Sequence, residues 1–289
     1  MSNQLKVICE PLPATLPGME VHLLGRKITC MTAPSVIQAV HNACAQERRI
    51  TVLSCNVHGF NLSLQLPWFY ESLKRADIVR CDSMGILKAI RFMGLNLPDT
   101  YQVSWTHLMS GLLDHCDQQG FSVFLLGSKP QHLQRALDRV RLQYPNIRLA
   151  GHHGYFSADN PAENNAVVEQ INRVNPQILI VGMGMPVQEH WVRCNQDRLD
   201  VNAVMVGGAV IDRLAGVVPD CPELLANRGF EWLYRLIREP KRLWVRYVIG
   251  NLAFALQIAL AKYSPFHAKL LNPPPTQVLA QPRTQYEVS

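Results

Sequence analysis

The sequence predicts an α/β fold in which a Rossmann-like parallel sheet is covered by helices on both faces. Between Val21 and Gly208, short apolar runs alternate with longer amphipathic segments. The apolar runs are nearly continuous, as expected for parallel strands that are buried on both faces. The amphipathic segments are long enough to be the crossover helices that parallel strands require.

Six apolar runs are the expected strands. In chain order they read ITVLSCN, DIVRCD, FSVFLLG, IRLAGHHG, QILIVGMG and NAVMVGG. The expected helices around them include APSVIQAVHNACAQE, PQHLQRALDRVRLQY, PAENNAVVEQINRVN and PVQEHWVRCNQDRL. Residues 1–227 are therefore predicted to form one α/β core.

The segment from Gly229 to Tyr247, GFEWLYRLIREPKRLWVRY, concentrates cations and aromatic rings. On a helix its four arginines would form one stripe, because they are three, four and four residues apart: Arg235, Arg238, Arg242 and Arg246. Pro240 is expected to split or kink this helix, since proline lacks a backbone N–H. Two interpretations remain open, a solvated basic face above a packed apolar face and a surface that binds lipid head groups or phosphates.

Two further parts are expected after the core. Residues 228–271 are predicted to be a basic and aromatic helical appendage that docks on a membrane, and residues 272–289 a Pro-rich disordered tail. Within the appendage, the longest apolar tract is Val248–Leu260. This tract is too short to span a bilayer, which needs about 20 residues, but it could lie in the membrane interface.

Composition narrows the class of protein. The 289 residues are 48% hydrophobic and 17% charged, which suits one large domain or two small ones. The net charge of +6 is uneven, with an excess of Arg and Lys after Asn227, and this favours an anionic partner at one end over a nucleic-acid-binding surface. None of the eight cysteines lies in a C-x-x-C motif, so they are expected to be buried or incidental thiols in a reducing cytosol. The first residues do not resemble a signal peptide.

Polar residues and glycines gather where the expected strands end. Ligands of such sheets bind beyond the carboxyl ends of the strands, so this edge is the expected pocket. The residues at these ends are Ser54, Asn56, Asp82, Gly127, Ser128, His152, His153, Gly154, Gly182, Gly184, Gly207 and Gly208.

Asp82 is the candidate catalytic carboxylate. It follows an apolar strand and precedes the helix-like stretch MGILKAIRFMG. An aspartate in this position commonly caps the helix, and it can also take a proton from an attacking hydroxyl group. The two roles are compatible.

The stretch GMGMPVQEHWV predicts an anion site. Gly182 and Gly184 follow a strand and let backbone N–H groups approach a ligand, and the helix that Pro186 starts favours an anion such as a diphosphate at its N-terminus. Gln188 and Glu189 lie in the first turn of that helix, where an acidic residue also complements the helix dipole.

A third glycine-containing stretch is VGGAVIDRLAG. Gly207 and Gly208 end the last strand, and Asp212 either bonds a ribose or a base edge or pairs with Arg213.

Other chemistries have little support. His152 and His153 have no further ligand at metal-site spacing, so no metal is expected. The stretch LLGSKPQHL has one glycine where a dinucleotide fingerprint needs three, which argues against an oxidoreductase.

Taken in order, these motifs are similar to those of the WecG/TagA/CpsF family, glycosyltransferase family 26. The resemblance covers roughly residues 18–247 and rests on SCN, CDSMG, FLLGSKP, GHHGYF, PQILIVGMGMPVQEHW, VGGAVIDRLAG and FEWLYRLIREPKRLWVRY. It implies an inverting, metal-independent transferase without a cofactor. Such an enzyme moves a sugar from a UDP-sugar to a polyprenyl-diphosphate-linked sugar at the inner face of the cytoplasmic membrane, in polysaccharide or exopolysaccharide biosynthesis.

The resemblance also implies roles for particular residues. The family's catalytic aspartate falls on Asp82, and its T-x-N pair falls on Ser54 and Asn56. Its Q-E pair falls on Gln188 and Glu189, and its C-terminal arginines that engage the lipid diphosphate or the membrane fall on Arg235, Arg242 and Arg246. The strand-end residues are also expected to bind the substrates: Gly127, Gly182, Gly184, Gly207, Gly208 and Asp212.

The sequence departs from the family pattern at a few positions. Gln102 and Thr106 replace the arginine and aspartate of an R-V-x-G-x-D stretch, and Asp220 stands where the family has the arginine of R-A-P. The D-G-x-G motif reads Asp82-Ser83-Met84-Gly85. These departures leave the two sugars and the oligomeric state open. They also leave open a second interpretation, a catalytically lapsed protein that binds sugar nucleotides or acts as a scaffold in a polysaccharide assembly complex.

Overall fold

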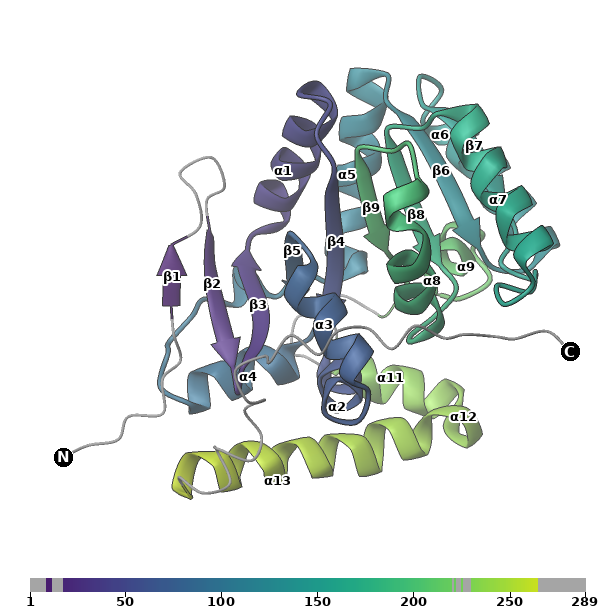
Figure 1. Cartoon of the computed structure of the whole chain (residues 1–289). Helices are drawn as coiled ribbons and strands as arrows, with labels where there is room; N and C mark the ends of the chain where they lie inside the picture. Colours follow the sequence, from purple (N-terminus) through teal and green to yellow (C-terminus); the bar gives the residue numbers. More distant parts are fainter. Residues whose placement is uncertain (1–8, 12–17, 220, 222–224, 226–229, 265–289) are drawn as a thin grey trace, which may run out of the picture.

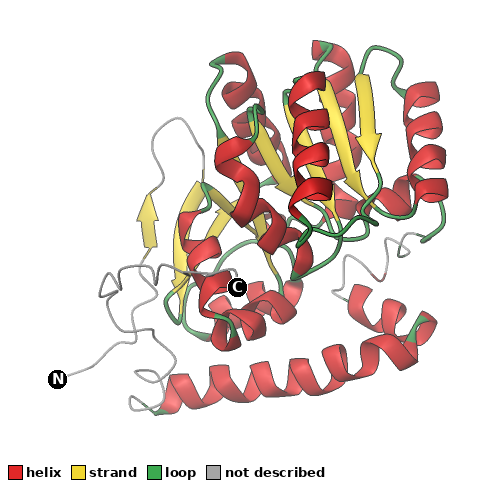
Figure 2. Ribbon diagram, turned by 45° about the vertical axis from the view of Figure 1, so that its right-hand side comes forward, coloured by secondary structure: helices red, strands yellow, loops and turns green. Residues whose placement is uncertain are grey.

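The computed structural model describes residues 9–11, 18–219, 221, 225 and 230–264 (Figure 1). The expected tail and Asp220 lie outside these ranges. Within them, nine strands form one sheet in the order β1-β2-β3-β5-β4-β9-β8-β6-β7. Helices cover both faces of this sheet, which confirms the predicted fold class (Figure 2).

The six expected strands all exist and all pair in parallel with one another. Their side chains alternate between two apolar layers: in the strand that follows residue 121, Phe124 and Leu126 face one layer and Val123 and Leu125 the other. The strands are β4 (Ile50–Cys55), β5 (Ile78–Cys81), β6 (Ser122–Gly127), β7 (Arg148–His152), β8 (Ile178–Gly182) and β9 (Ala203–Val206).

The sheet has an antiparallel edge that the sequence did not predict. β1 (Cys9–Pro11) pairs with β2 (Gly18–Leu23), β2 pairs with β3 (Arg26–Met31), and β3 then joins β5 in parallel. The turn between β2 and β3 places both Leu24 and Gly25 at positive φ, 48° and 76°. Because a leucine occupies a turn position that usually carries Asn, Asp or Gly, the hairpin had no recognisable turn signal.

The helices divide between the two faces of the sheet. On one face lie α1 (Ala33–Ala45), α5 (Trp105–Gln119), α6 (Pro130–Gln143) and α9 (Val210–Leu214). On the other lie α2 (Val57–Gln65), α3 (Pro67–Arg75), α4 (Met84–Phe92), α7 (Pro161–Val174) and α8 (Val187–Asn195). Two 3₁₀ turns, Asp99–Tyr101 and Gln196–Arg198, connect elements of the core.

The C-terminal segment forms a chain of helices below the core (Figure 1). It comprises α11 (Glu231–Arg238), α12 (Pro240–Trp244), a π-helical turn η3 (Val245–Ile249) and α13 (Gly250–Tyr263). Pro240 is the first residue of α12, so the expected break in the helix is confirmed.

α13 packs against the core through one of its faces. Phe254, Ile258 and Ala261 are buried and belong to the same apolar layer as α2 and α4. The Phe60 and Phe254 rings meet edge to face with centroids 5.0 Å apart, and Asn61 Nδ2 donates a hydrogen bond to Gly250 O at 2.9 Å. The appendage therefore shares an apolar core with the α/β unit.

The outward side of η3 and α13, which form one continuous helix, is apolar and exposed. Six of its exposed apolar side chains follow helical spacing, and we call them the α13 stripe: Val245, Ile249, Leu252, Leu256, Leu260 and Tyr263. The helix that contains them, Val245–Tyr263, has 19 residues and a mean hydropathy of 1.2, so by length and composition it is long enough to cross a membrane. The helix extends beyond the predicted apolar tract Val248–Leu260 on both sides.

Candidate active site

The pairing of β4 with β5 brings two predicted residues together. Ser54 lies opposite Arg80 and Cys55 opposite Cys81, so the chains leave the sheet side by side at Asn56 and Asp82. The Asp82 N–H donates to Cys55 O at 3.0 Å. Asn56 Nδ2 donates to Asp82 Oδ2 at 3.4 Å.

The two helices that follow this pair are capped by Asn56 and Ser83, and not by Asp82. Asn56 caps α2 by accepting a hydrogen bond from the Gly59 N–H at 3.0 Å. The cap of α4 is Ser83, whose hydroxyl accepts from the Ile86 N–H at 3.4 Å. The interpretation of Asp82 as the N-cap was therefore wrong by one residue, because the shorter serine side chain fills that position.

Ser54 and Asp82 differ in access. Ser54 is buried within β4 with 4% of its surface exposed, whereas 18% of the Asp82 side chain is exposed. A substrate can therefore reach the carboxylate, while the serine hydroxyl lies beneath the site in this structure.

Gln188 connects the two glycine turns. Its Oε1 accepts hydrogen bonds from the Gly184 N–H at 3.2 Å and from the Gly208 N–H at 2.9 Å. Only 2% of the residue is exposed. The turn after β8 and the turn after β9 are thus held together by one side-chain oxygen.

Two of the predicted glycines are required by close packing. Gly127 has φ of 144°, and a Cβ there would lie 2.2 Å from Gly182 O. A Cβ on Gly207 would lie 2.4 Å from Val210 Cγ1. These glycines allow the strand ends to converge on the site, whether or not they also touch a ligand.

Glu189 is a buried acid beside the site. It is 1% exposed, its Oε1 accepts a hydrogen bond from Gln188 Nε2 at 2.9 Å, and its Oε2 has no hydrogen-bond partner within the described part of the chain. The pKa of this carboxyl is raised to about 7, mainly by burial and to a smaller extent by the negative charge of Asp82. The hydrogen bond from Gln188 and the positive charge of Arg246 act in the opposite direction.

Arg246 reaches the site from the C-terminal segment. Lying in η3, it interacts electrostatically with Glu189 and with His58, the second residue of α2. Burial and the charge of Arg246 lower the pKa of His58 to about 4, so this imidazole is neutral near pH 7. Arg235 lies on α11, and the side chain of Arg242 lies outside the part of the chain that the structure describes.

Asp212 has two hydrogen-bond donors. Ser128 Oγ donates at 2.5 Å and the His132 Nδ1 lies 2.8 Å from the same carboxylate oxygen. The neighbouring Arg213 donates to the Thr106 hydroxyl. Thr106, where the sequence departs from the family pattern, is thus hydrogen-bonded to α9, the helix that carries Asp212.

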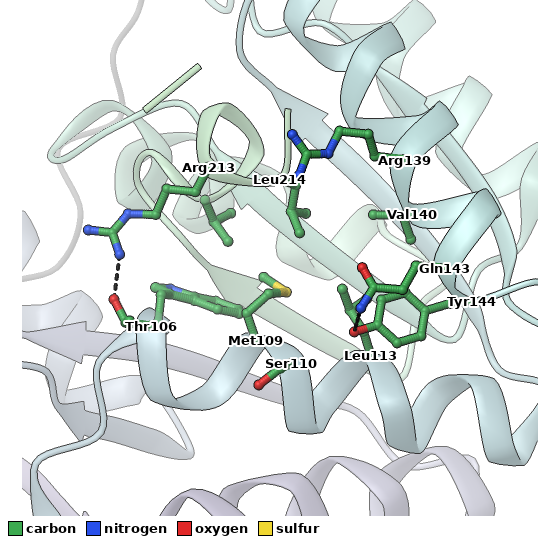
Figure 3. A pocket seen from close by; sticks show the side chains of 12 residues that line it. Thr106, Met109, Ser110, Leu113, Arg139, Val140, Gln143, Tyr144, Arg213 and Leu214 are labelled. Atoms are coloured by element: carbon green, nitrogen blue, oxygen red, sulfur yellow. Dashed lines mark hydrogen bonds between the residues drawn. The ribbon is translucent and has the colours of Figure 1, made fainter. Parts of the chain in front are cut away.

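Thr106 lies at the rim of a pocket between α5, α6 and α9 (Figure 3). The cavity has a volume of about 240 Å³. Arg139 and Arg213 approach it from opposite sides, and Tyr144 and Gln143 close one end (Figure 3). It lies on the face of the sheet opposite to α13.

Sequence reasoning did not identify Arg80 or His58 as site residues. Arg80 is fully buried, and its Nη1 lies 3.7 Å from Asp82 Oδ1. The signal was present, because an arginine in an otherwise apolar strand, two residues before an aspartate, projects to the same side as that aspartate. His58 gave no signal, since its place beside Arg246 depends on tertiary contacts.

Among the described residues, no group of three or more His, Cys, Asp or Glu side chains is arranged to hold a metal ion. His152 Nδ1 is bonded to the carbonyl oxygen of His153, 2.7 Å away.

Comparison with known proteins identifies relatives of this chain. The sequence model of the glycosyl transferase WecG/TagA/CpsF family matches residues 21–267 of this chain. Among similar proteins are the N-acetylglucosaminyldiphosphoundecaprenol N-acetyl-beta-D-mannosaminyltransferases of Staphylococcus aureus strains MW2 and MRSA252. Each is 26% identical over 249 residues, which cover 84% of this chain and 93% of the relative.

Proposed function

Because this chain belongs to the WecG/TagA/CpsF family of glycosyltransferases, we propose that it moves a sugar from a UDP-sugar to a saccharide linked to polyprenyl diphosphate. The relatives are named for transfer of N-acetylmannosamine to N-acetylglucosaminyldiphosphoundecaprenol. Because Gln102 and Thr106 depart from the family pattern, these two sugars are not carried over to this enzyme as its donor and acceptor sugars. The product would be an intermediate of a cell-surface polysaccharide.

The observation that carries the proposal is the Asn56–Asp82 pair at the carboxyl edge of the sheet. In the proposed reaction, Asp82 takes the proton of the acceptor hydroxyl while the hydroxyl oxygen attacks the anomeric carbon of the donor. The bond from that carbon to the diphosphate oxygen breaks on the opposite face, so the configuration inverts and UDP leaves. Asn56 orients the carboxylate through its hydrogen bond.

The leaving diphosphate needs positive charge or hydrogen-bond donors. The turn at Gly182 and Gly184, the N-terminus of α8 and the guanidinium of Arg246 are proposed to provide them. Gln188 supports this turn through Gly184 and Gly208. Asp212, with its donors Ser128 and His132, is proposed to bind the ribose or the base edge.

The acceptor is a lipid, and the α13 stripe suits a lipid surface. We propose that the protein attaches peripherally to the inner face of the cytoplasmic membrane through this stripe. The buried side of α13 is already occupied by Phe60 and its neighbours, which favours lying in the interface over spanning the bilayer. Arg235, Arg242 and Arg246 are proposed to engage the lipid diphosphate or anionic head groups.

The test is turnover of the purified chain with a panel of UDP-sugars and a short-chain polyprenyl-diphosphate-linked saccharide. UDP release that requires both substrates, with an inverted glycosidic linkage in the product, is the expected result. Binding of UDP-sugars without turnover across the panel would favour the alternative, a lapsed sugar-nucleotide-binding or scaffold protein.

A further inference from the structure

Arg80 is a buried charge in the middle of β5. None of its side-chain surface is exposed, and its strand neighbours Ile78, Val79 and Cys81 are apolar and buried. A guanidinium group remains charged in proteins, so its burial is costly unless it is paired. The contacts of this side chain should therefore explain why it is there.

Three contacts hold the guanidinium group. Nη1 donates to Val103 O at 2.5 Å and lies 3.7 Å from Asp82 Oδ1, and the guanidinium carbon lies 4.9 Å from the centroid of the Trp105 ring. Trp105 is itself fixed, because its Nε1–H donates to Val206 O, at the end of β9, at 2.7 Å. Arg80 thus ties the carboxylate to the start of α5 and to β9.

The remaining donors of Arg80 are poorly used. Its Nε and Nη2 atoms are buried without a hydrogen-bond partner in the described part of the chain. Unsatisfied buried donors cost stability, so the site is not arranged for stability alone. An apolar residue would suit this strand position better unless the charge served another purpose.

The groups around Asp82 indicate what the charge of Arg80 does. Cys55 and Cys81 lie beside Asp82 on the strands, and Glu189 interacts with it from α8. Glu189 also interacts with Arg246 of η3. Two carboxyl groups that interact disfavour having both charges at once, and a guanidinium within 4 Å counteracts this effect. Arg80 is therefore suited to keep Asp82 ionised beside a second acid.

We propose that Arg80 is a positioning residue that holds the Asp82 carboxylate ionised and fixed in direction for proton abstraction. The proposal rests on the transferase function above and adds a residue to which the family motifs assign no role. Arg80 touches no substrate in this scheme, because its side chain is covered by Val103 and Trp105.

The experiment compares Arg80→Met and Arg80→Lys with a matched control, Arg26→Met. Arg26 is also a buried arginine, bonded to Leu24 O at 2.5 Å and lying 5.5 Å from the Phe60 ring centroid. The measurements are kcat, the KM for the UDP-sugar, and the pH profile of kcat, for each full-length variant.

We expect Arg80→Met to reduce kcat by about 10–100-fold with KM changed less than twofold, and to move the acid limb of the profile to higher pH. Arg80→Lys, which keeps the charge on a shorter side chain without the guanidinium plane, should restore the acid limb with an intermediate kcat. Arg26→Met should leave the acid limb unchanged. An identical profile for Arg80→Met and Arg26→Met would overturn the proposal.

Two further variants separate the possible failures. If Arg80→Met does not fold, the kcat of Arg80→Lys tests the orienting role in its place. A wild-type kcat in Arg80→Lys would refute that role. In an Asp82→Asn background, Arg80→Met should cause no further loss, because the group it positions is gone. If Asp82→Asn itself turns over normally, the proposed function fails at its base, and this outcome is distinct from failure of the Arg80 role.

Discussion

Asn56 and Asp82 follow neighbouring parallel strands, and the amide of the first donates a hydrogen bond to the carboxylate of the second over 3.4 Å. The oxygen of the same side-chain amide accepts a hydrogen bond from the Gly59 N–H and caps α2, so both polar atoms of the Asn56 side chain have a partner. Asp82 is left with a partly exposed carboxylate, since Ser83 caps α4. This arrangement is consistent with the proposed role of Asp82 as the proton acceptor.

Asp82→Asn should lower kcat by about 10²–10⁴-fold while the fold and donor affinity are kept, because a positioned general base contributes that factor. Steady-state UDP release and a donor-binding titration would measure the two effects. The matched control is Asp77→Asn, at the opposite end of the same strand, where the carboxylate accepts from the Thr51 N–H. Turnover close to wild type in Asp82→Asn would remove Asp82 from the mechanism.

Glu189→Gln should become relatively more stable than wild type as the pH rises. The wild-type carboxyl has a pKa of about 7 in the folded state against 4.5 for the free group, so between these values the unfolded chain loses its proton first. The contribution of Glu189 to the unfolding free energy of the wild type is therefore complete below pH 4.5. It is lost progressively up to about pH 7, by at most about 3 kcal/mol.

Thermal unfolding from pH 5 to 8 would test this prediction. The Tm difference between Glu189→Gln and wild type should grow with pH, whereas Glu169→Gln, on the exposed side of α7, should show no such trend. A pH-independent difference for Glu189→Gln would mean that this carboxyl is ionised throughout the range.

Leu252→Ser combined with Leu256→Ser should weaken binding to anionic phospholipid vesicles by at least about tenfold, because two apolar side chains are removed from the lipid contact. The Tm should change little, since these residues are 71% and 57% exposed. Leu142→Ser, on α6 and 88% exposed, is the control. Equal vesicle binding by the double variant and the control would exclude the α13 stripe as the membrane contact.

Residues 1–227 are predicted from the sequence to form one α/β core. In the structure, Phe254, Ile258 and Ala261 of α13 complete an apolar layer of that core, so its stability should depend on them. Phe254→Ala alone should cost about 3–5 kcal/mol in unfolding free energy, measured by urea denaturation. A loss below 1 kcal/mol would mean that α13 is held only loosely.

Turnover in excess EDTA should equal turnover in its absence, since the leaving group is proposed to be neutralised by the helix N-terminus and Arg246. Initial rates after exhaustive chelation would measure this. Restoration of activity only by added Mg²⁺ or Mn²⁺ would instead assign that task to a cation.

The sequence predicted the parts of the site that depend on local pattern. Strand ends are visible as changes from apolar to polar residues, so Asn56 and Asp82 could be named. Their proximity could not be predicted, because it depends on β4 and β5 being neighbours in the sheet. Helix breaks were equally visible, as Pro240 shows. The hairpin of β2 and β3 was missed because Leu24 occupies its turn.

Tertiary contacts could not be predicted in this way. Nothing in the local pattern indicates that Arg246, more than 180 residues from His58 in the chain, lies beside it. The raised pKa of Glu189 likewise depends on burial by distant elements and not on its place in the first turn of a helix. Arg80 is intermediate, since its side of the strand was predictable and its cover by Trp105 was not.

The shared hydrogen bonds of Gln188 have a consequence for motion. One oxygen holds the amide protons of Gly184 and Gly208, so a single rotation of the Gln188 side chain releases both turns together. The two amide protons would then share one opening equilibrium, so their protection factors against exchange with solvent deuterium should be similar. A nucleotide that immobilises either turn would slow exchange at both, including the turn it does not touch.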